Sequence, residues 1–258
     1  MYPNMAKNQL ISRVRLGLRR RKTSKQRRFW VRVLWLSLRL IIALVLFSVA
    51  IVVVLRWVDP PFSAVMAQRA VEAWWRDDRN YHLRQQWLDW RRISPQVPLA
   101  MLAAEDQRFA EHHGFDFVSI KDAVVDHIDG QKLRGASTIS QQVAKNLFLW
   151  SSPSFIRKGF EVYFTLLIEL CWSKQRILEV YVNVAELGRG IFGVATASTI
   201  YFHKPAGALT AADAALLAAS LPNPIIIKID PPSDYALRRQ GQIMQQMELL
   251  GLGYLNRL

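Results

Sequence analysis

The chain has 258 residues, a formal net charge of +14 and one cysteine, Cys171. The first 58 residues hold 13 of the 34 Lys and Arg residues and no acid, whereas the remainder is almost neutral. Basic charge confined to one end, directly before an apolar run, argues against a nucleic-acid-binding domain, and one cysteine excludes a disulfide within the chain. We therefore expect one sizeable domain with an appendage, and no nucleic-acid partner.

A hydrophobic run follows the basic residues. Residues 40–55 carry no charge, and residues 33–38 extend the run past Arg39. A helix over residues 33–55, rising about 1.5 Å per residue, is long enough to cross a hydrocarbon core of about 30 Å. The run therefore predicts one transmembrane helix.

The charges around this run predict its orientation. Segments rich in Lys and Arg stay in the cytoplasm, so we expect the amino terminus there and the residues after the span outside. This divides the chain into a basic cytoplasmic tail at 1–30, a transmembrane anchor at 31–58 and an exported domain at 59–258. A cleaved signal peptide is the alternative, since Ser48 and Ala50 are small, but the apolar run continues to Leu55.

The first third of the exported part begins with a helix breaker. Pro60 and Pro61 end the span, and the alanine-rich residues 62–79 predict a second helix. Residues 81–94 mix aromatic and basic side chains, which fits either a packed loop or a surface on lipid headgroups. We favour packing.

The rest of the exported part predicts more helices. Helix formers dominate residues 155–186, where Ser173 is a candidate N-cap between two helices, and residues 210–213 resemble a capping box. Sustained alternation is absent apart from the short apolar run at 225–229. The fold class is therefore expected to be mainly α.

Glu105 is the first candidate for chemistry. It ends a short apolar helix and precedes Asp106, so desolvation and a neighbouring negative charge are both expected to raise its pKa. A carboxylate of this kind can remove a proton from a sugar hydroxyl. An acid at a helix end beside Arg108 is the simpler structural alternative.

A polar row follows at 134–146. Small residues there permit close backbone approach, and hydroxyls, amides and a cation come next, which suits a polyhydroxylated, anionic ligand. A helix beginning near Thr138 would also point free N–H groups at an anion, although a structural N-cap explains the threonine equally well. The candidate ligand-binding residues of this row are Ser137, Thr138, Gln141, Gln142 and Lys145.

A charged triplet lies further along. Helical spacing brings Arg157, Lys158 and Glu161 onto one face, and surface ion pairing is the usual meaning of such a triplet. With Glu105, the triplet supplies two separated carboxylates and several cations. Sugar transfer with a phosphate leaving group needs a base and such charges.

Several segments, in this order, resemble the signatures of the peptidoglycan glycosyltransferase family, which occurs as stand-alone enzymes and within bifunctional penicillin-binding proteins. The resemblance covers about residues 60–230. The matching segments are EDQRFAEHHGFD at 105–116, GASTISQQVAKN at 135–146, RKGFE at 157–161, RILEVYVNVAELG at 176–188 with GIFGV at 190–194, and AALLAASLPNP at 214–224.

The resemblance implies a fold and a reaction. The fold would be a lysozyme-like helical lobe with a smaller membrane-facing lobe, preceded by the transmembrane helix. Glu105 would deprotonate the C4 hydroxyl of the acceptor sugar, which attacks the lipid-pyrophosphate donor, lipid II. A β-1,4 link would form with inversion, and undecaprenyl pyrophosphate would leave.

The resemblance also implies roles for other residues. Glu161 would be the second catalytic acid, holding the pyrophosphate or a divalent cation, Mg²⁺ or Mn²⁺, for which it is a candidate ligand. Lys145, Arg157 and Lys158 would surround the donor phosphates, and the polar row would line the cleft. Relatives often carry a further arginine before the third signature, where this chain has the stretch 151–154.

The expected setting follows from the same resemblance. The domain at 59–258 would be a periplasmic glycosyltransferase of a bacterial inner membrane, with lipid II, the growing glycan strand and membrane lipid as partners. Other cell-wall synthesis or division proteins are candidate partners. Because the sequence shows no Ser-x-x-Lys motif, we expect a monofunctional polymerase.

Two other functions remain open. A lytic transglycosylase or lysozyme-like enzyme also uses one glutamate in a helical lobe, but it has no need for cations around a donor phosphate. A single-pass scaffold of the cell-wall machinery would use the carboxylates for structure alone. Replacing Glu105 by Gln separates an enzyme from a scaffold.

Overall fold

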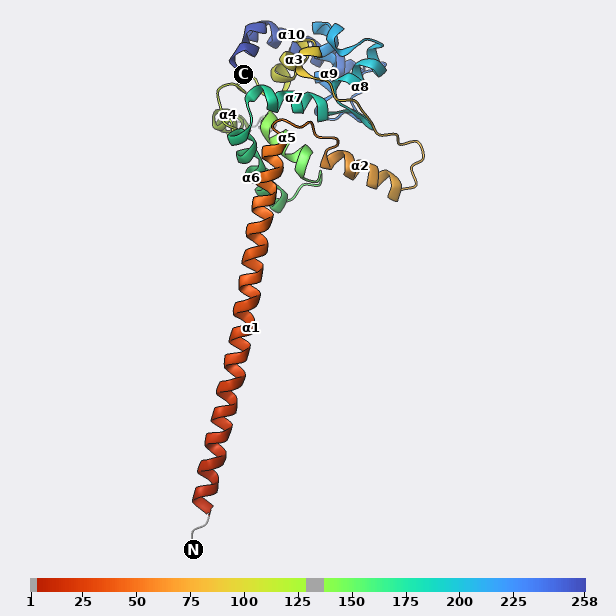
Figure 1. Ribbon diagram of the computed structural model, residues 1–258. Helices are drawn as coiled ribbons and strands as arrows, with labels where there is room; N and C mark the ends of the chain where they lie inside the picture. The colour runs from red at the N-terminus through yellow and green to blue at the C-terminus, as the bar shows by residue number, and fades with distance from the viewer. Residues whose placement is uncertain (1–3, 129–136) are drawn as a thin grey trace. The chain divides into compact units, whose positions relative to one another are not determined.

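The computed structural model in Figure 1 describes residues 4–128 and 137–258. Arg134, Gly135 and Ala136 of the polar row lie outside the described residues. The chain divides into two compact units, Met1–Ile51 and Val52–Leu258. The helices are α1 (Asn4–Val54), α2 (Ala64–Trp75), α3 (Gln96–Glu105), α4 (Phe117–Ile128), α5 (Ile139–Phe148), α6 (Phe155–Cys171), α7 (Lys174–Val184), α8 (Val194–Ala197), α9 (Ala211–Ser220) and α10 (Asp234–Leu250).

Short elements complete the described chain, and their small share confirms the mainly α prediction. They are the strands β1 (Arg84–Gln85), β2 (Glu186–Gly188) and β3 (Ile191–Phe192), the 3₁₀ helices η1 (Trp90–Arg92), η3 (Ala206–Ala208) and η4 (Leu252–Arg257), and the π-helical turn η2 (Ser198–Phe202).

Most of helix α1 lies in the first unit, which ends at Ile51. Its apolar portion, Gln26–Val54, is long and apolar enough to cross a membrane, and only 6% of the most apolar stretch is buried by protein. Large apolar side chains such as Leu34, Leu36 and Phe47 are exposed, as a lipid-facing helix requires. The same helix begins at Asn4, so the predicted boundary at residue 30 marks a change of composition and not the end of an element.

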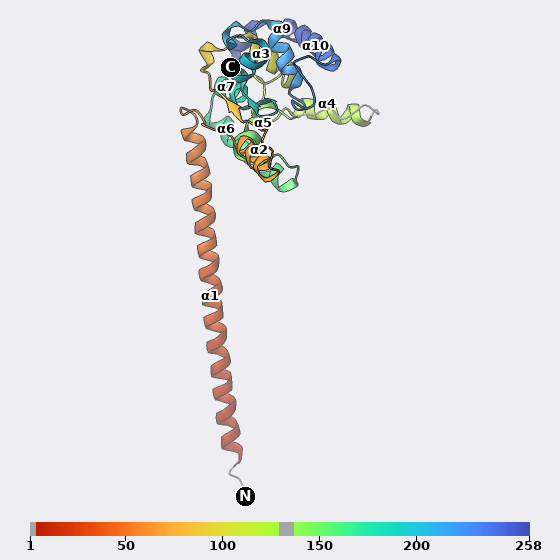
Figure 2. The same ribbon diagram turned by 90° about the vertical axis from the view of Figure 1, so that its right-hand side faces the viewer.

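The second unit is built from two groups of helices. Helices α3, α9 and α10 pack together, and α5 packs against α2, α6 and α7. Helix α7 also contacts α3 and so joins the groups, which Figure 2 shows from the side. Met101, Phe109 and Leu217 are among the largest fully buried side chains. The carboxyl end of α3 and the amino-terminal part of α5 carry residues of the site described below.

A small sheet lies beside the helices. β3 is central, pairing in parallel with β1 and antiparallel with β2. The apolar run at 225–229 forms no strand; only Ile229 makes an isolated bridge, with Pro232. Alternation over so few residues is a weak strand signal, since a strand also needs a partner edge.

Gly193 is required where the sheet leads into α8. Its φ is +76°, and a Cβ atom there would lie 2.6 Å from the backbone oxygen of Asn183. Glycine alone adopts this backbone conformation without strain and leaves room for the close approach. The GIFGV segment is therefore explained by packing of α8 against the end of α7.

Hydroxyl side chains start most of the helices. Ser173 accepts a hydrogen bond from the Arg176 N–H and Thr210 forms a capping box with Asp213, which confirms both predictions. The loop before α3 is packed, as expected: Leu88 and Ile93 are buried.

Candidate active site

Glu105 lies at the carboxyl end of α3 and accepts a hydrogen bond from Gln142 of α5. The Gln142 Nε2 to Glu105 Oε2 distance is 2.7 Å. The other end of the amide, Gln142 Oε1, accepts a hydrogen bond of 3.1 Å from the hydroxyl of Tyr181 on α7. Because Tyr181 fixes the orientation of the Gln142 amide, the N–H₂ group of this amide points to the carboxylate of Glu105. Three helices therefore fix the position of one oxygen of Glu105.

Burial raises the pKa of the Glu105 carboxyl, and the charge of Asp106 adds to this effect. The hydrogen bond from Gln142 and the positive charges of Arg239 and Lys145 act in the opposite direction. The net shift is upward. The direction and both predicted causes, desolvation and the neighbouring acid, are thereby confirmed.

Asp106 joins the end of α3 to the start of α5. Its buried carboxylate accepts a hydrogen bond of 3.0 Å from the backbone N–H of Ile139 and lies 2.9 Å from His112 Nε2. A carboxylate at a helix amino terminus is favoured by the free N–H groups there. Asp106 therefore positions α5, and with it Gln142, beside Glu105. The role of His112 is that of partner to Asp106.

The predicted polar row divides into two kinds of residue. Thr138 and Gln141 are buried and form a reciprocal capping box at the start of α5. The Thr138 hydroxyl also donates to the Gly114 carbonyl. Ser137 is exposed, and Gln142 contacts Glu105. Thr138 and Gln141 thus shape the site through the helix start, while Ser137 and Gln142 present polar atoms.

The charged triplet forms a cluster around a buried carboxylate. Glu161 Oε2 accepts a hydrogen bond of 2.5 Å from Arg157 Nη1, and Glu161 Oε1 accepts one from the Lys158 ammonium. The Glu161 side chain is only 4% exposed, so the expectation of a surface ion pair is wrong for this residue. The helix face that carries it packs inward on α5, which residue spacing alone cannot show.

Lys145 lies in the field of both carboxylates. Burial lowers the pKa of its ammonium, while the charges of Glu161 and Glu105 oppose that shift. Arg157 and Lys158 add like-charge repulsion. Three cations from α5 and α6 therefore surround a single carboxylate, Glu161, which leaves net positive charge for an anionic ligand.

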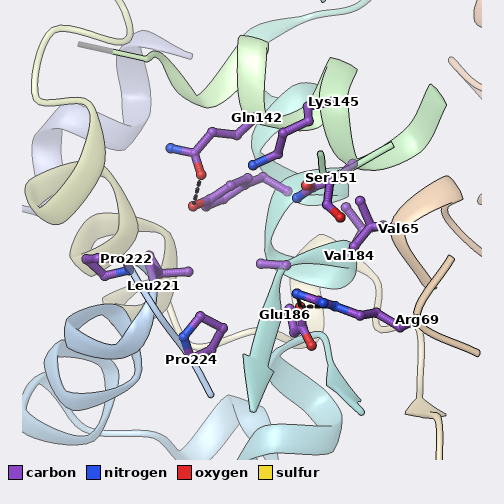
Figure 3. A pocket seen from close by; sticks show the side chains of 13 residues that line it. Val65, Arg69, Gln142, Lys145, Ser151, Val184, Glu186, Leu221, Pro222 and Pro224 are labelled. Carbon is purple, nitrogen blue, oxygen red and sulfur yellow. Dashed lines mark hydrogen bonds and ion pairs between the residues drawn. The ribbon is translucent and has the colours of Figure 1, made fainter. Parts of the chain in front are cut away.

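Glu105 and its hydrogen-bond partner Gln142 each line a pocket. The first has a volume of about 240 Å³ and is lined by Glu105, Arg108, Ser137 and neighbouring residues. The second, about 180 Å³, is lined by Gln142 and Lys145 among others and is shown in Figure 3.

The second pocket contains residues that the sequence did not single out. Tyr181 points its hydroxyl to Gln142, and Arg69 of α2 forms an ion pair of 3.2 Å with Glu186 (Figure 3). Burial raises the pKa of the Glu186 carboxyl. Ser151, from the stretch 151–154, lines the same pocket as Arg69. Tyr181 and Glu186 lie in the fourth signature segment, residues 176–188, and that match could have identified them as candidates. No sequence pattern pointed to Arg69.

Glu179 and Asn183 have a structural role. Asn183 donates to the Leu88 carbonyl and accepts from the Leu88 N–H, with both distances below 3 Å. Glu179 accepts from the Trp90 N–H at 2.8 Å. These bonds fix the loop before α3 on α7.

Carboxylates that could hold a metal ion already have partners. The two oxygens of Glu161 bind Arg157 and Lys158. Asp106, His112 and Asp116 place ligand atoms within 4.8 Å of one another, but Asp106 caps α5 and Asp116 accepts from the start of α4. Within residues 4–128 and 137–258, these groups do not form an open set of ligands for a hard cation.

Comparisons with known proteins show the family of this chain. The family model described as Transglycosylase matches residues 73–248. A biosynthetic peptidoglycan transglycosylase from Xylella fastidiosa (strain 9a5c) is 52% identical over 211 residues, covering 82% of this chain and 87% of that protein. The protein of the same description from Cronobacter sakazakii (strain ATCC BAA-894) is 49% identical over 222 residues, covering 86% and 92%. This chain therefore belongs to the transglycosylase family.

Proposed function

We propose that this transglycosylase polymerises lipid II into β-1,4-linked peptidoglycan strands, with Glu105 as general base. The observation that carries this proposal is the pairing of one oriented, half-buried carboxylate with a group of cations on neighbouring helices. A hydrolase needs the carboxylate but not the cations. A transferase with a pyrophosphate leaving group needs both.

The proposed step uses the groups as follows. The oxygen of the acceptor C4 hydroxyl attacks the anomeric carbon of the donor, and Glu105 accepts the proton of that hydroxyl. The bond from that carbon to the pyrophosphate breaks, and inversion follows from attack on the opposite face. Lys145, Arg157 and Lys158 stabilise the negative charge that develops on the pyrophosphate. Glu161 holds two of these cations in place, and Ser137 and Gln142 contact the sugars.

A divalent cation remains part of the proposal. Since the carboxylate of Glu161 is occupied by Arg157 and Lys158, Mg²⁺ or Mn²⁺ would bind chiefly through pyrophosphate oxygens of the substrate, which are hard ligands. It would add positive charge at the leaving group. Titration with a chelator, followed by readdition of Mg²⁺, measures this dependence.

The setting is also proposed. The basic residues before the span favour a cytoplasmic amino terminus and a periplasmic catalytic domain in a bacterial inner membrane. Exposed apolar side chains on α2 and α6 suit contact with lipid, near the lipid-linked substrate. They include Trp74, Trp75, Phe155, Ile156 and Leu170, all at least 72% exposed.

Incubation of the purified protein with labelled lipid II and Mg²⁺ tests the proposal. Wild type should give a polymer that lysozyme digests, Glu105→Gln should give none, and Glu248→Gln, at an exposed position on α10, should match wild type. Absence of polymer from wild type, together with cleavage of preformed glycan, would establish the lytic alternative. Unchanged polymerisation by Glu105→Gln would remove Glu105 as the base.

A further inference from the structure

The carbonyl end of α3 is covered by side chains from two directions. Gln107 Nε2 donates to the Ala103 carbonyl at 3.1 Å, and Arg239 Nη2 donates to the Ala104 carbonyl at 3.2 Å. Carbonyls in the last turn of a helix have no partner within the helix, so a cation placed there both satisfies them and opposes the helix dipole. Arg239 thus caps the peptide group next to Glu105.

Arg239 comes from a part of the chain that none of the five signatures covers. It lies on α10, which packs against α3 and α9, and 135 residues separate it from Ala104. The guanidinium also donates to Gln242 Oε1 at 3.3 Å, one turn further along α10. The arginine is half-buried, whereas the adjacent Arg238 is exposed. Two hydrogen bonds from one planar group restrict its orientation.

The charges near Glu105 determine whether its carboxylate is ionised, and Arg239 is one of them. Burial, the end of the α3 dipole and Asp106 all disfavour the ionised carboxylate, and a general base must be ionised to accept a proton. Lys145 of α5 and Arg239 are the cations that favour the ionised form, and Tyr181 of α7 faces the carboxylate as an uncharged hydroxyl. Lys145 belongs to the cation cluster proposed to hold pyrophosphate, so the negative charge of bound substrate will offset part of its effect on Glu105. Arg239 is held at the end of α3 by its hydrogen bond to the Ala104 carbonyl, so its charge stays near Glu105.

We propose that Arg239 is a positioning residue for the catalytic base: it caps the end of α3 that carries Glu105 and keeps this carboxylate ionised in the substrate complex until it accepts the proton. The inference rests on the proposed function, because it assigns Arg239 a role through Glu105. Arg239 contacts no reacting atom and acts through the helix end and its charge.

The pH dependence of kcat at saturating lipid II in detergent, measured with full-length protein, tests this inference, because kcat reports the ionisation of groups in the substrate complex. Loss of the arginine charge favours protonated Glu105, so the acid limb of Arg239→Gln should move upward by about 0.5 pH unit. At a pH on that limb the rate should fall about threefold, whereas the plateau above it should stay within about twofold of wild type. Arg239→Lys should restore most of the shift, and Arg238→Gln should behave as wild type.

Two outcomes would overturn the inference. An acid limb at the wild-type position in Arg239→Gln would show that the arginine does not act on the base. A lower plateau with an unmoved limb would show that it supports the fold alone. Glu105→Gln distinguishes failure of this inference from failure of the proposed function. If that variant still polymerises lipid II, Glu105 is not the base, whatever the position of the acid limb in Arg239→Gln.

Discussion

At the scale of single residues, the site depends on how polar atoms are oriented. Gln142 has two ends with opposite hydrogen-bonding character, and the Tyr181 hydroxyl decides which end faces Glu105. Tyr181 itself is buried, and burial raises the pKa of its phenol well above the ordinary value, so it stays a neutral donor. The base is therefore held by a chain of two neutral side chains.

Removing the first member of that chain should weaken catalysis without removing the base. In Tyr181→Phe the Gln142 amide loses one neutral hydrogen bond, about 1 kcal/mol, which corresponds to about a fivefold lower kcat. Single-turnover rates on lipid II, beside thermal melting to confirm folding, measure the effect. A wild-type rate in a correctly folded variant would contradict the oriented-amide account.

Lys145 leads to a prediction on the alkaline side. Burial lowers the pKa of its ammonium, so the charge proposed to hold pyrophosphate is present below that pKa and is lost as pH rises through it, earlier than for an ordinary lysine. Lys145→Arg, whose guanidinium stays charged, should keep activity to higher pH even if its maximum is lower. Rates between pH 7 and 10, a range that lies below the ordinary lysine pKa of about 10.4, test this. If the alkaline limb of the pH profile is the same in Lys145→Arg and wild type, that limb arises from a group other than Lys145.

Sequence reasoning was informative for residues with a local signal and silent for the rest. The end of an apolar helix and the adjacent acid were enough to predict the raised pKa of Glu105. Arg239 and Arg69 reach the site only through the packing of α10 and α2, which no local pattern encodes. The burial of Glu161 was misread because spacing shows which residues share a helix face, but not what that face packs against.

At the scale of elements, one arginine joins the end of α1 to α7. Arg176 donates to the carbonyls of Leu55 and Val58 and pairs with Asp59 and Glu179, at distances of 2.8 to 3.3 Å. Helix ends leave carbonyls unpaired, and a guanidinium with five donors can satisfy several of them at once.

Loss of this arginine should destabilise the second unit. Arg176→Ala removes the donor from the carbonyls of Leu55 and Val58 and the cation from Glu179, which should cost about 2 kcal/mol and lower Tm by about 5 °C. Arg189→Ala, which removes a half-exposed ion pair with Asp78, should change Tm far less. Equal shifts for the two variants would contradict the assigned importance of Arg176.

Helix starts were the best predicted elements, because N-cap hydroxyls at Ser173 and Thr210 are local signals. The sheet was missed. Its strands are two or three residues long and pair across distant parts of the chain, with Arg84 opposite Ile191. Such pairing depends on tertiary packing more than on sequence alternation.

At the scale of the whole chain, an apolar helix and a catalytic unit occur in one polypeptide. Residues from Val52 onward belong to the second unit, and Trp172 Nε1 donates to the Val52 carbonyl at 2.7 Å. An anchor confines an enzyme to the surface where a lipid-linked substrate lies, so encounter takes place in two dimensions.

Deletion of residues 1–51 should separate catalysis from this confinement. The shortened protein keeps Val52–Asp59 and the contacts of Arg176, so in detergent it should polymerise lipid II at close to the wild-type rate. On lipid II in bilayer vesicles its rate should fall about tenfold or more, because the local concentration given by anchoring is lost. Equal activity of both proteins on vesicles would remove the proposed role of the anchor.

The central role proposed for this protein is polymerisation with pyrophosphate departure, driven by Glu105. The most direct test counts, in one reaction, glycosidic bonds formed and lipid pyrophosphate released from labelled lipid II. We expect one lipid pyrophosphate for each new bond with wild type, and neither product above background with Glu105→Gln. Bond formation by Glu105→Gln at the wild-type rate, or cleaved glycan without lipid pyrophosphate release by wild type, would contradict this role.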